Sequence, residues 1–144
     1  MRFPRLRDDR GSVLLLGLGA VVIGLIAVVV GVDASAAYLQ RRALVNLADA
    51  TALAGAQAID LAAYYRDGAN ATTSLDPVSV RVRVQSFLEE SAGGGIDGVR
   101  VEGVTTDGRS VAVLLSAPLR LPFRPADERI AAEATAVLAY RSGA

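Results

Sequence analysis

The sequence predicts an α+β protein in which a long N-terminal transmembrane helix continues into an exposed amphipathic helix, followed by a short helix and a small antiparallel sheet. Three observations predict this class: an apolar run at residues 13–32, no glycine or proline in residues 33–54, and an Asp-Gly turn between two valine-rich segments. The expected divisions are a cytoplasmic basic leader (1–12), the transmembrane helix (13–32), its extracytoplasmic extension (33–65) and a small extracytoplasmic α+β domain (66–144).

The apolar run contains 20 consecutive uncharged residues, VLLLGLGAVVIGLIAVVVGV. A helix of that length is about 30 Å long, which is the thickness of the hydrocarbon layer of a bilayer. A helix satisfies its backbone hydrogen bonds within the segment, as a single span in lipid requires. The run therefore predicts one membrane-spanning helix.

The first ten residues of the chain predict the orientation of this helix. They contain four arginines (Arg2, Arg5, Arg7 and Arg10) and two aspartates. By the positive-inside rule this end stays in the cytoplasm, so the C-terminal domain is extracytoplasmic and the protein is a single-pass protein of the cytoplasmic membrane.

A cleaved signal peptide is the alternative. The small residues Ala34 and Ala36 fit a cleavage site between Ala36 and Ala37, which would release a soluble secreted domain. The apolar run is, however, longer than the roughly 7–15 residues of an ordinary signal peptide.

Small residues recur regularly within the run. The set is Gly17, Ala20, Gly24, Ala27, Gly31 and Ala34. Alternating steps of three and four residues place these positions along one helix face, where small side chains let two membrane helices pack closely. We call this set the small-residue strip and predict that it packs against another helix; the alternative is that glycine and alanine are simply frequent in membrane spans.

Helix is expected to continue beyond the membrane to about Asp60 or Tyr64, because alanine, leucine, glutamine and arginine favour helix. Apolar residues at near-helical spacing give this part a sticky face: Leu44, Leu47, Ala48, Leu53 and Ala56. Asp33, the first charged residue after the run, either pairs with a charge in an assembly or marks the membrane boundary.

A polar loop at 66–76 precedes a second helix, in which Asp76 is the N-cap and Pro77 the first helical residue. Val80, Val84, Phe87 and Leu88 would share one face of this helix. The alternation of valines at 78–84 also fits a strand. We favour the helix because the glycines at 93–95 would end it naturally.

The last third reads as sheet. Segments 99–105 and 110–116 flank Asp107-Gly108, a strong hairpin signal. Three prolines (Pro118, Pro122 and Pro125) mark an irregular connection. Residues 129–141 then alternate with period two, and a third strand is favoured over an alanine-rich helix. Its expected inner face carries Ile130, Ala132, Ala134, Ala136, Leu138 and Tyr140.

Composition argues against catalysis. The chain has no cysteine and no histidine, so thiolate chemistry, the commonest general base and the commonest metal ligands are lacking. Gly93–95 lacks the Lys-Ser/Thr of a phosphate loop. The net charge is zero, with no basic stripe for nucleic acid. We expect no enzyme activity, no cofactor or metal, no nucleic acid and no small-molecule substrate.

A recognisable pattern surrounds the apolar run. Arg10-Gly11 precedes it; an aspartate, a Tyr-Leu-x-Arg-Arg step and an alanine-rich Asn-x-Ala-Asp segment follow. The residues that carry the pattern are Asp33, Tyr38, Arg41, Arg42, Asn46, Asp49 and Gly55, which we call the motif residues. From residue 10 to 59 the chain resembles the Flp (Tad) pilus-assembly TadE/TadG-like proteins, as a short actinobacterial-type member.

The resemblance implies a pilin-like fold and a pseudopilin-like structural or accessory subunit of a Flp/Tad-type pilus or secretion system. Its partners would be membrane lipid and other Tad subunits, contacted by helix packing. It also implies a processing site for prepilin peptidase between Gly11 and Ser12. Leu16 stands where TadE-type members have glutamate, five residues after the cleaved glycine, which weighs against cleavage.

Overall fold

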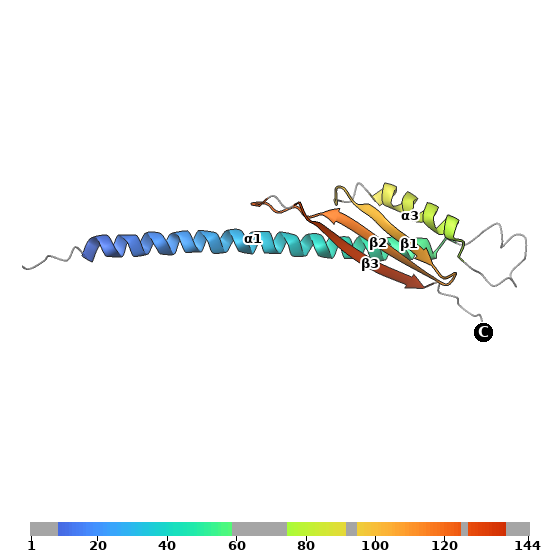
Figure 1. The fold of residues 1–144 in the computed structure, drawn as a ribbon, viewed down its shortest axis with the longest axis horizontal. Coiled ribbons are helices and arrows are strands. Elements are labelled where there is room, and N and C mark those ends of the chain that lie inside the picture. Colours follow the sequence, from blue (N-terminus) through green and yellow to red (C-terminus); the bar gives the residue numbers. More distant parts are fainter. Residues whose placement is uncertain (1–8, 59–74, 92–94, 125–126, 138–144) are drawn as a thin grey trace, which may run out of the picture.

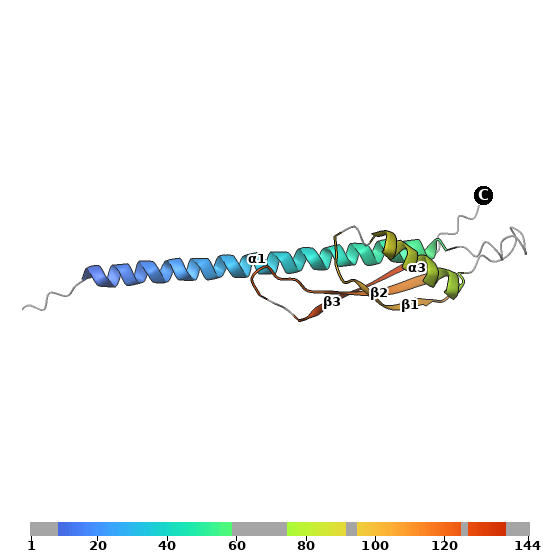
Figure 2. The same cartoon turned by 90° about the horizontal axis from the view of Figure 1, so that it is seen from above.

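The computed structural model describes residues 9–58, 75–91, 95–124 and 127–137. A single long helix, α1 (Asp9–Ala56), is followed by α3 (Pro77–Ser91) and by the strands β1 (Arg100–Thr106), β2 (Ser110–Pro118) and β3 (Arg129–Val137). The sheet and α3 pack against the C-terminal part of α1, and the N-terminal part projects well beyond them (Figures 1 and 2). The predicted α+β class is confirmed.

Helix α1 runs unbroken through the expected membrane boundary at Asp33, as predicted. It begins at Asp9, four residues ahead of the apolar run, and ends at Ala56, so the predicted end at Asp60 or Tyr64 is wrong. The chain leaves the α-helix through tighter bonds: the N–H of Gln57 is shared between the carbonyls of Leu53 (3.2 Å) and Ala54 (3.3 Å). The bond to Ala54 spans three residues, and this 3₁₀-type spacing is typical of a helix terminus.

Helix α3 starts at the predicted position. Asp76 is the N-cap of this helix: its Oδ2 accepts hydrogen bonds from the N–H (2.8 Å) and the hydroxyl (3.0 Å) of Ser79. Pro77 occupies the first helical position. Val80 and Val84 are buried, so the helical alternative is the correct one, and the helix ends at Ser91. Most of the predicted loop at 66–76 lies outside the described residues.

The cap of α3 has a consequence for stability against pH. The bonds from Ser79 lower the pKa of the Asp76 carboxyl below its ordinary value of 3.8. A carboxyl with a lowered folded-state pKa stabilises the fold fully above its ordinary pKa, and that contribution is lost as the pH falls through the lowered value. We expect Asp76→Ser, whose hydroxyl caps without titrating, to have a lower urea midpoint than the wild type at pH 7, with the difference closing below about pH 3.8. A constant difference down to pH 2 would contradict this role.

The sheet is antiparallel with the order β1-β2-β3. The predicted hairpin is confirmed: Oδ1 of Asp107 accepts the N–H groups of Ser110 (2.6 Å) and Arg109 (2.9 Å), which lowers the pKa of Asp107. Gly108 follows with φ +86°, a left-handed conformation that suits glycine. β3 pairs with β2 from Pro118↔Arg129 to Ser110↔Val137, so a strand, not a helix, forms here. Leu138 and Tyr140 lie outside the described residues.

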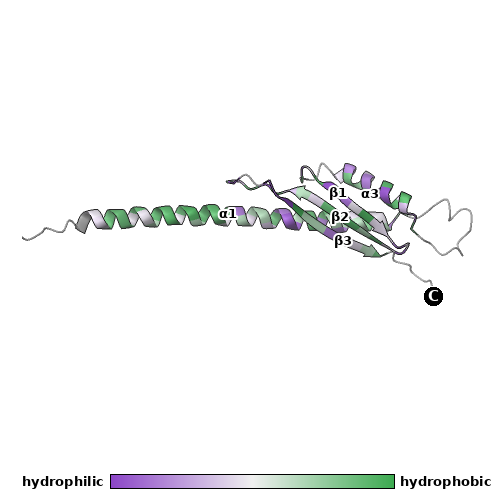
Figure 3. Cartoon of the chain, viewed as in Figure 1, coloured by the Kyte–Doolittle hydropathy of each residue, from purple (hydrophilic) through white to green (hydrophobic). Residues whose placement is uncertain are grey.

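One face of the sheet packs on the helices. Alternate residues of β2 are buried there (Val111, Val113, Leu115 and Ala117), together with Ala132 and Ala134 of β3. They meet Leu44, Ala48 and Ala52 of α1 and Val80 and Val84 of α3. Figure 3 shows that apolar residues also dominate the projecting part of α1, where nothing in the structure covers them.

The other face of the sheet carries a polar network that joins all three strands. The hydroxyl of Ser116 on β2 donates to Glu102 on β1 and accepts from the guanidinium of Arg129 on β3 (2.8 Å). Arg129 also donates to the carbonyl of Gly98 (3.3 Å). The network therefore cross-links the sheet near the end where β2 leaves for β3.

Candidate functional site

The projecting part of α1 is apolar and uncovered. Its large side chains from Val13 to Val32 are 41–77% exposed, apart from Val29, which is half-buried. Among the described residues, α1 is the one helix that is long enough and apolar enough to cross a membrane, by length and composition. Soluble monomers rarely expose a continuous apolar surface along so many helical turns. Apolar surfaces of this kind usually contact lipid or another protein.

Where the apolar run ends, the loop between β2 and β3 is hydrogen-bonded to α1. We call it the β2–β3 loop; the structure describes its residues 119–124 and 127–128. Asp33 is only 1% exposed. The N–H of Phe123 donates to its Oδ1 (3.1 Å), and Nε of Arg124 donates to its Oδ2 (3.1 Å). Both carboxylate oxygens of a buried acid are thereby satisfied by the fold itself.

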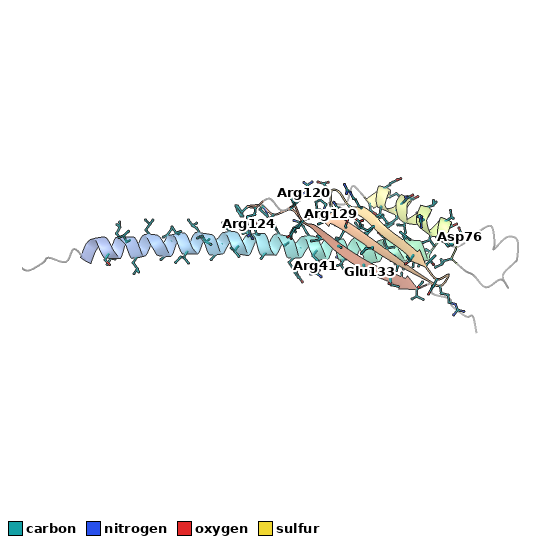
Figure 4. All side chains as sticks on the ribbon, viewed as in Figure 1. Arg41, Asp76, Arg120, Arg124, Arg129 and Glu133 are labelled. Carbon is teal, nitrogen blue, oxygen red and sulfur yellow. The ribbon has the colours of Figure 1, made fainter. Side chains whose placement is uncertain are left out.

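Two turns further along α1, Gln40 makes a second attachment. Its Oε1 accepts the N–H of Arg120 (2.9 Å), and its Nε2 donates to the carbonyl of the same residue. The side-chain amide thus pairs with the backbone of Arg120 much as a neighbouring strand would. Figure 4 shows Arg124 lying farther toward the N-terminal end of α1 than the labelled Arg120 and Arg129.

The face of α1 that meets the domain follows from helix geometry. At 100° per residue, Val29, Gln40, Leu44 and Thr51 lie within about 60° of Asp33 around the axis. All of these residues are buried or half-buried. One continuous face of the helix therefore holds both the β2–β3 loop and the core.

The small-residue strip lies on the other side of α1. Its positions fall between about 100° and 200° around the axis from Asp33. Its glycines at 17, 24 and 31 have no atom within 4 Å of where a Cβ would stand. The domain leaves this face open, and its packing against another helix stays a prediction.

The motif residues divide between these two faces. Asp33 and Gly55 face the domain: Asp33 holds the β2–β3 loop, and a Cβ on Gly55 would stand 3.1 Å from both Val111 and Val84. Tyr38, Arg42 and Asp49 are exposed and lie about 140–180° from Asp33, in line with the small-residue strip. Arg41 and Asn46 are exposed at the flanks of this outer face.

Asp33 was expected to pair within an assembly or simply to mark the membrane boundary; the structure gives it a partner in its own chain, Arg124. Sequence reasoning missed Arg124, Phe123 and Gln40 as parts of this site. The only signal was a pair of arginines in a proline-rich connection, which fixes no partner.

In the part of the chain that the structure describes, no group of three or more acidic, His or Cys side chains is placed to hold a metal ion. The potential processing residues Gly11, Ser12, Ala36 and Ala37 all lie within α1.

Over the residues that the structure describes, these features define one candidate membrane-spanning helix and a small α+β unit docked on the continuation of that helix. Residues 11–58 match the Tad family model, described as "Putative Flp pilus-assembly TadE/G-like". The match spans 48 of the 144 residues, confirms the resemblance over α1, and supports a role related to pilus assembly. No curated protein matches the chain. No solved structure matches it either.

Proposed function

We propose that this protein is a non-enzymatic, membrane-anchored structural or accessory subunit, pseudopilin-like, of a Flp/Tad-type pilus-assembly or secretion system. In this proposal α1 spans the cytoplasmic membrane with its N-terminus inside, and the domain after Asp33 is extracytoplasmic. The observation that carries it is the uncovered apolar half of α1, inside the segment that matches the pilus-assembly family.

The outer face of α1 supports contact with other subunits through helix packing. It joins the small-residue strip to Tyr38, Arg42 and Asp49 without interruption by the domain. Small residues allow close approach in lipid, and beyond the lipid an arginine and an aspartate on one face offer charges of both signs to a neighbour. The domain-facing residues, by contrast, are already used within the chain.

Gly24 tests this packing. We expect Gly24→Leu to weaken self- or cross-association in the membrane about tenfold, which corresponds to about 1.4 kcal/mol, because the added side chain prevents two helix backbones from packing closely. A bacterial two-hybrid or crosslinking titration with Tad subunits measures the loss. The matched control is Gly19→Leu, the same change about 140° around the helix.

Both variants and the wild type must fractionate with the membrane, and the wild-type N-terminus should be Met1 or Ser12. Equal association of Gly24→Leu and Gly19→Leu would count against the strip. A wild-type chain that begins at Ala37 in the medium would contradict anchoring and favour the secreted alternative. Cleavage after Ala36 would also separate Asp33 from the loop it holds, which is why we do not favour it.

A further inference from the structure

We infer that the β2–β3 loop inserts into the interfacial layer of the same bilayer that α1 spans, with Phe123 as the inserted side chain. The inference rests on the proposed membrane span of α1. It gives the domain a second contact with lipid besides α1.

The position of the loop is the first argument. Asp33 is the first charged residue after the apolar run, and it holds the backbone N–H of Phe123 at 3.1 Å. Because helical side chains lean toward the N-terminus, the carboxylate lies level with the last turn of the run. Val29, one turn earlier on the same face, is the one half-buried residue among residues 11–32, as expected if the loop reaches that turn.

The composition of the loop is the second argument. Leu121, Pro122 and Phe123 form an apolar tip between Arg120 and Arg124. The Phe123 residue is 58% exposed and takes no part in the core, although its backbone is fixed. An aromatic side chain with flanking arginines suits the boundary between acyl chains and headgroups, where the ring enters apolar surroundings and the guanidinium groups extend to the phosphates.

The charges of the loop indicate whether its contact with the bilayer requires anionic lipid. Arg120 and Arg124 keep 69% and 65% of their side-chain surface exposed, but each has an acidic partner, Asp97 and Asp33 respectively. With this balance the apolar tip, not net charge, drives the contact. A zwitterionic bilayer of phosphatidylcholine should therefore be sufficient.

The composition of the chain offers a direct probe. It contains no tryptophan, so Phe123→Trp introduces the only one, at the tip, and this indole can be excited selectively beside the four tyrosines of the chain. The full-length variant is reconstituted in phosphatidylcholine vesicles. We expect its emission to shift to shorter wavelength than in the urea-unfolded chain, and brominated acyl chains to quench it several-fold more than they quench a tryptophan away from lipid.

The matched control is Val78→Trp, also an exposed apolar residue, 70% exposed. It lies at the start of α3, next to the labelled Asp76, at the opposite end of the domain from Arg124 (Figure 4). Vesicle flotation separates the two proposals: a chain that does not float with the lipid contradicts the membrane span. A chain that floats while Phe123→Trp is quenched no more than Val78→Trp overturns the loop insertion and leaves Phe123 to a protein neighbour.

Discussion

Replacing Leu44 by alanine is expected to lower the free energy of unfolding of the domain by about 3 kcal/mol, within the usual range for a leucine-to-alanine change in a core. Leu44 is completely buried at the point where α1 meets the sheet. Its removal takes away packing shared by both layers, and α1 and β2 cannot collapse freely around the cavity because each is held along its length.

The measurement is pulse proteolysis of the full chain in detergent across a urea series, since trypsin cleaves the unfolded domain at its arginines. The control is Leu53→Ala, the same change on the same helix at a residue that is 54% exposed. Surface substitutions usually stay within about 0.5 kcal/mol. If the two variants unfolded at the same urea concentration, α1 would not be part of the core of the domain.

Replacing Asp33 by alanine is expected to loosen the β2–β3 loop by about 2 kcal/mol, within the range for a buried donor left without an acceptor. The N–H of Phe123 loses its partner, and so does the guanidinium of Arg124, which can turn toward water because it is largely exposed. The hydrophobic core, which lies on the C-terminal side of Gln40 along α1, keeps all its contacts. The loss is therefore confined to the loop and the adjoining turn of α1.

Hydrogen exchange read by mass spectrometry on peptides that contain residues 119–124 measures this loosening. A cost of about 2 kcal/mol corresponds to an increase of about thirtyfold in the exchange rate. Asp49→Ala is the control, because Asp49 is an exposed aspartate of the same helix with no ion pair among the described residues. Exchange that rises equally in both variants would show that Asp33 does not hold the loop.

The sequence was sufficient for most of the elements because their signals are local. The cap at Asp76-Pro77 and the turn at Asp107-Gly108 each depend on residues within three positions, and both form as predicted. The predicted end of α1, at Asp60 or Tyr64, lies too far along the chain, because the alanine-rich sequence after Gly55 contains no signal that stops a helix.

The attachments of the β2–β3 loop could not be predicted in this way. Asp33 and Arg124 are 91 positions apart, and Gln40 and Arg120 are 80 apart. Single polar residues in a proline-rich connection have no period, so nothing in the sequence pairs them. Helix periodicity does place Asp33 and Gln40 on one face and Tyr38 and Asp49 on the opposite face. Which face the domain would take is known only from the structure.

The continuity of α1 past Asp33 gives the molecule the mechanics of a stiff lever. No break separates the apolar run from the part that carries the sheet, and the domain is fastened at Asp33 and packed around Gly55. From Asp33 to Ala56 the arm measures about 36 Å, so a tilt of about 20° within the bilayer displaces its far end by roughly 12 Å. In the proposed anchored state, neighbours that change the tilt of the membrane half would thus reorient the whole sheet, without any change inside the domain.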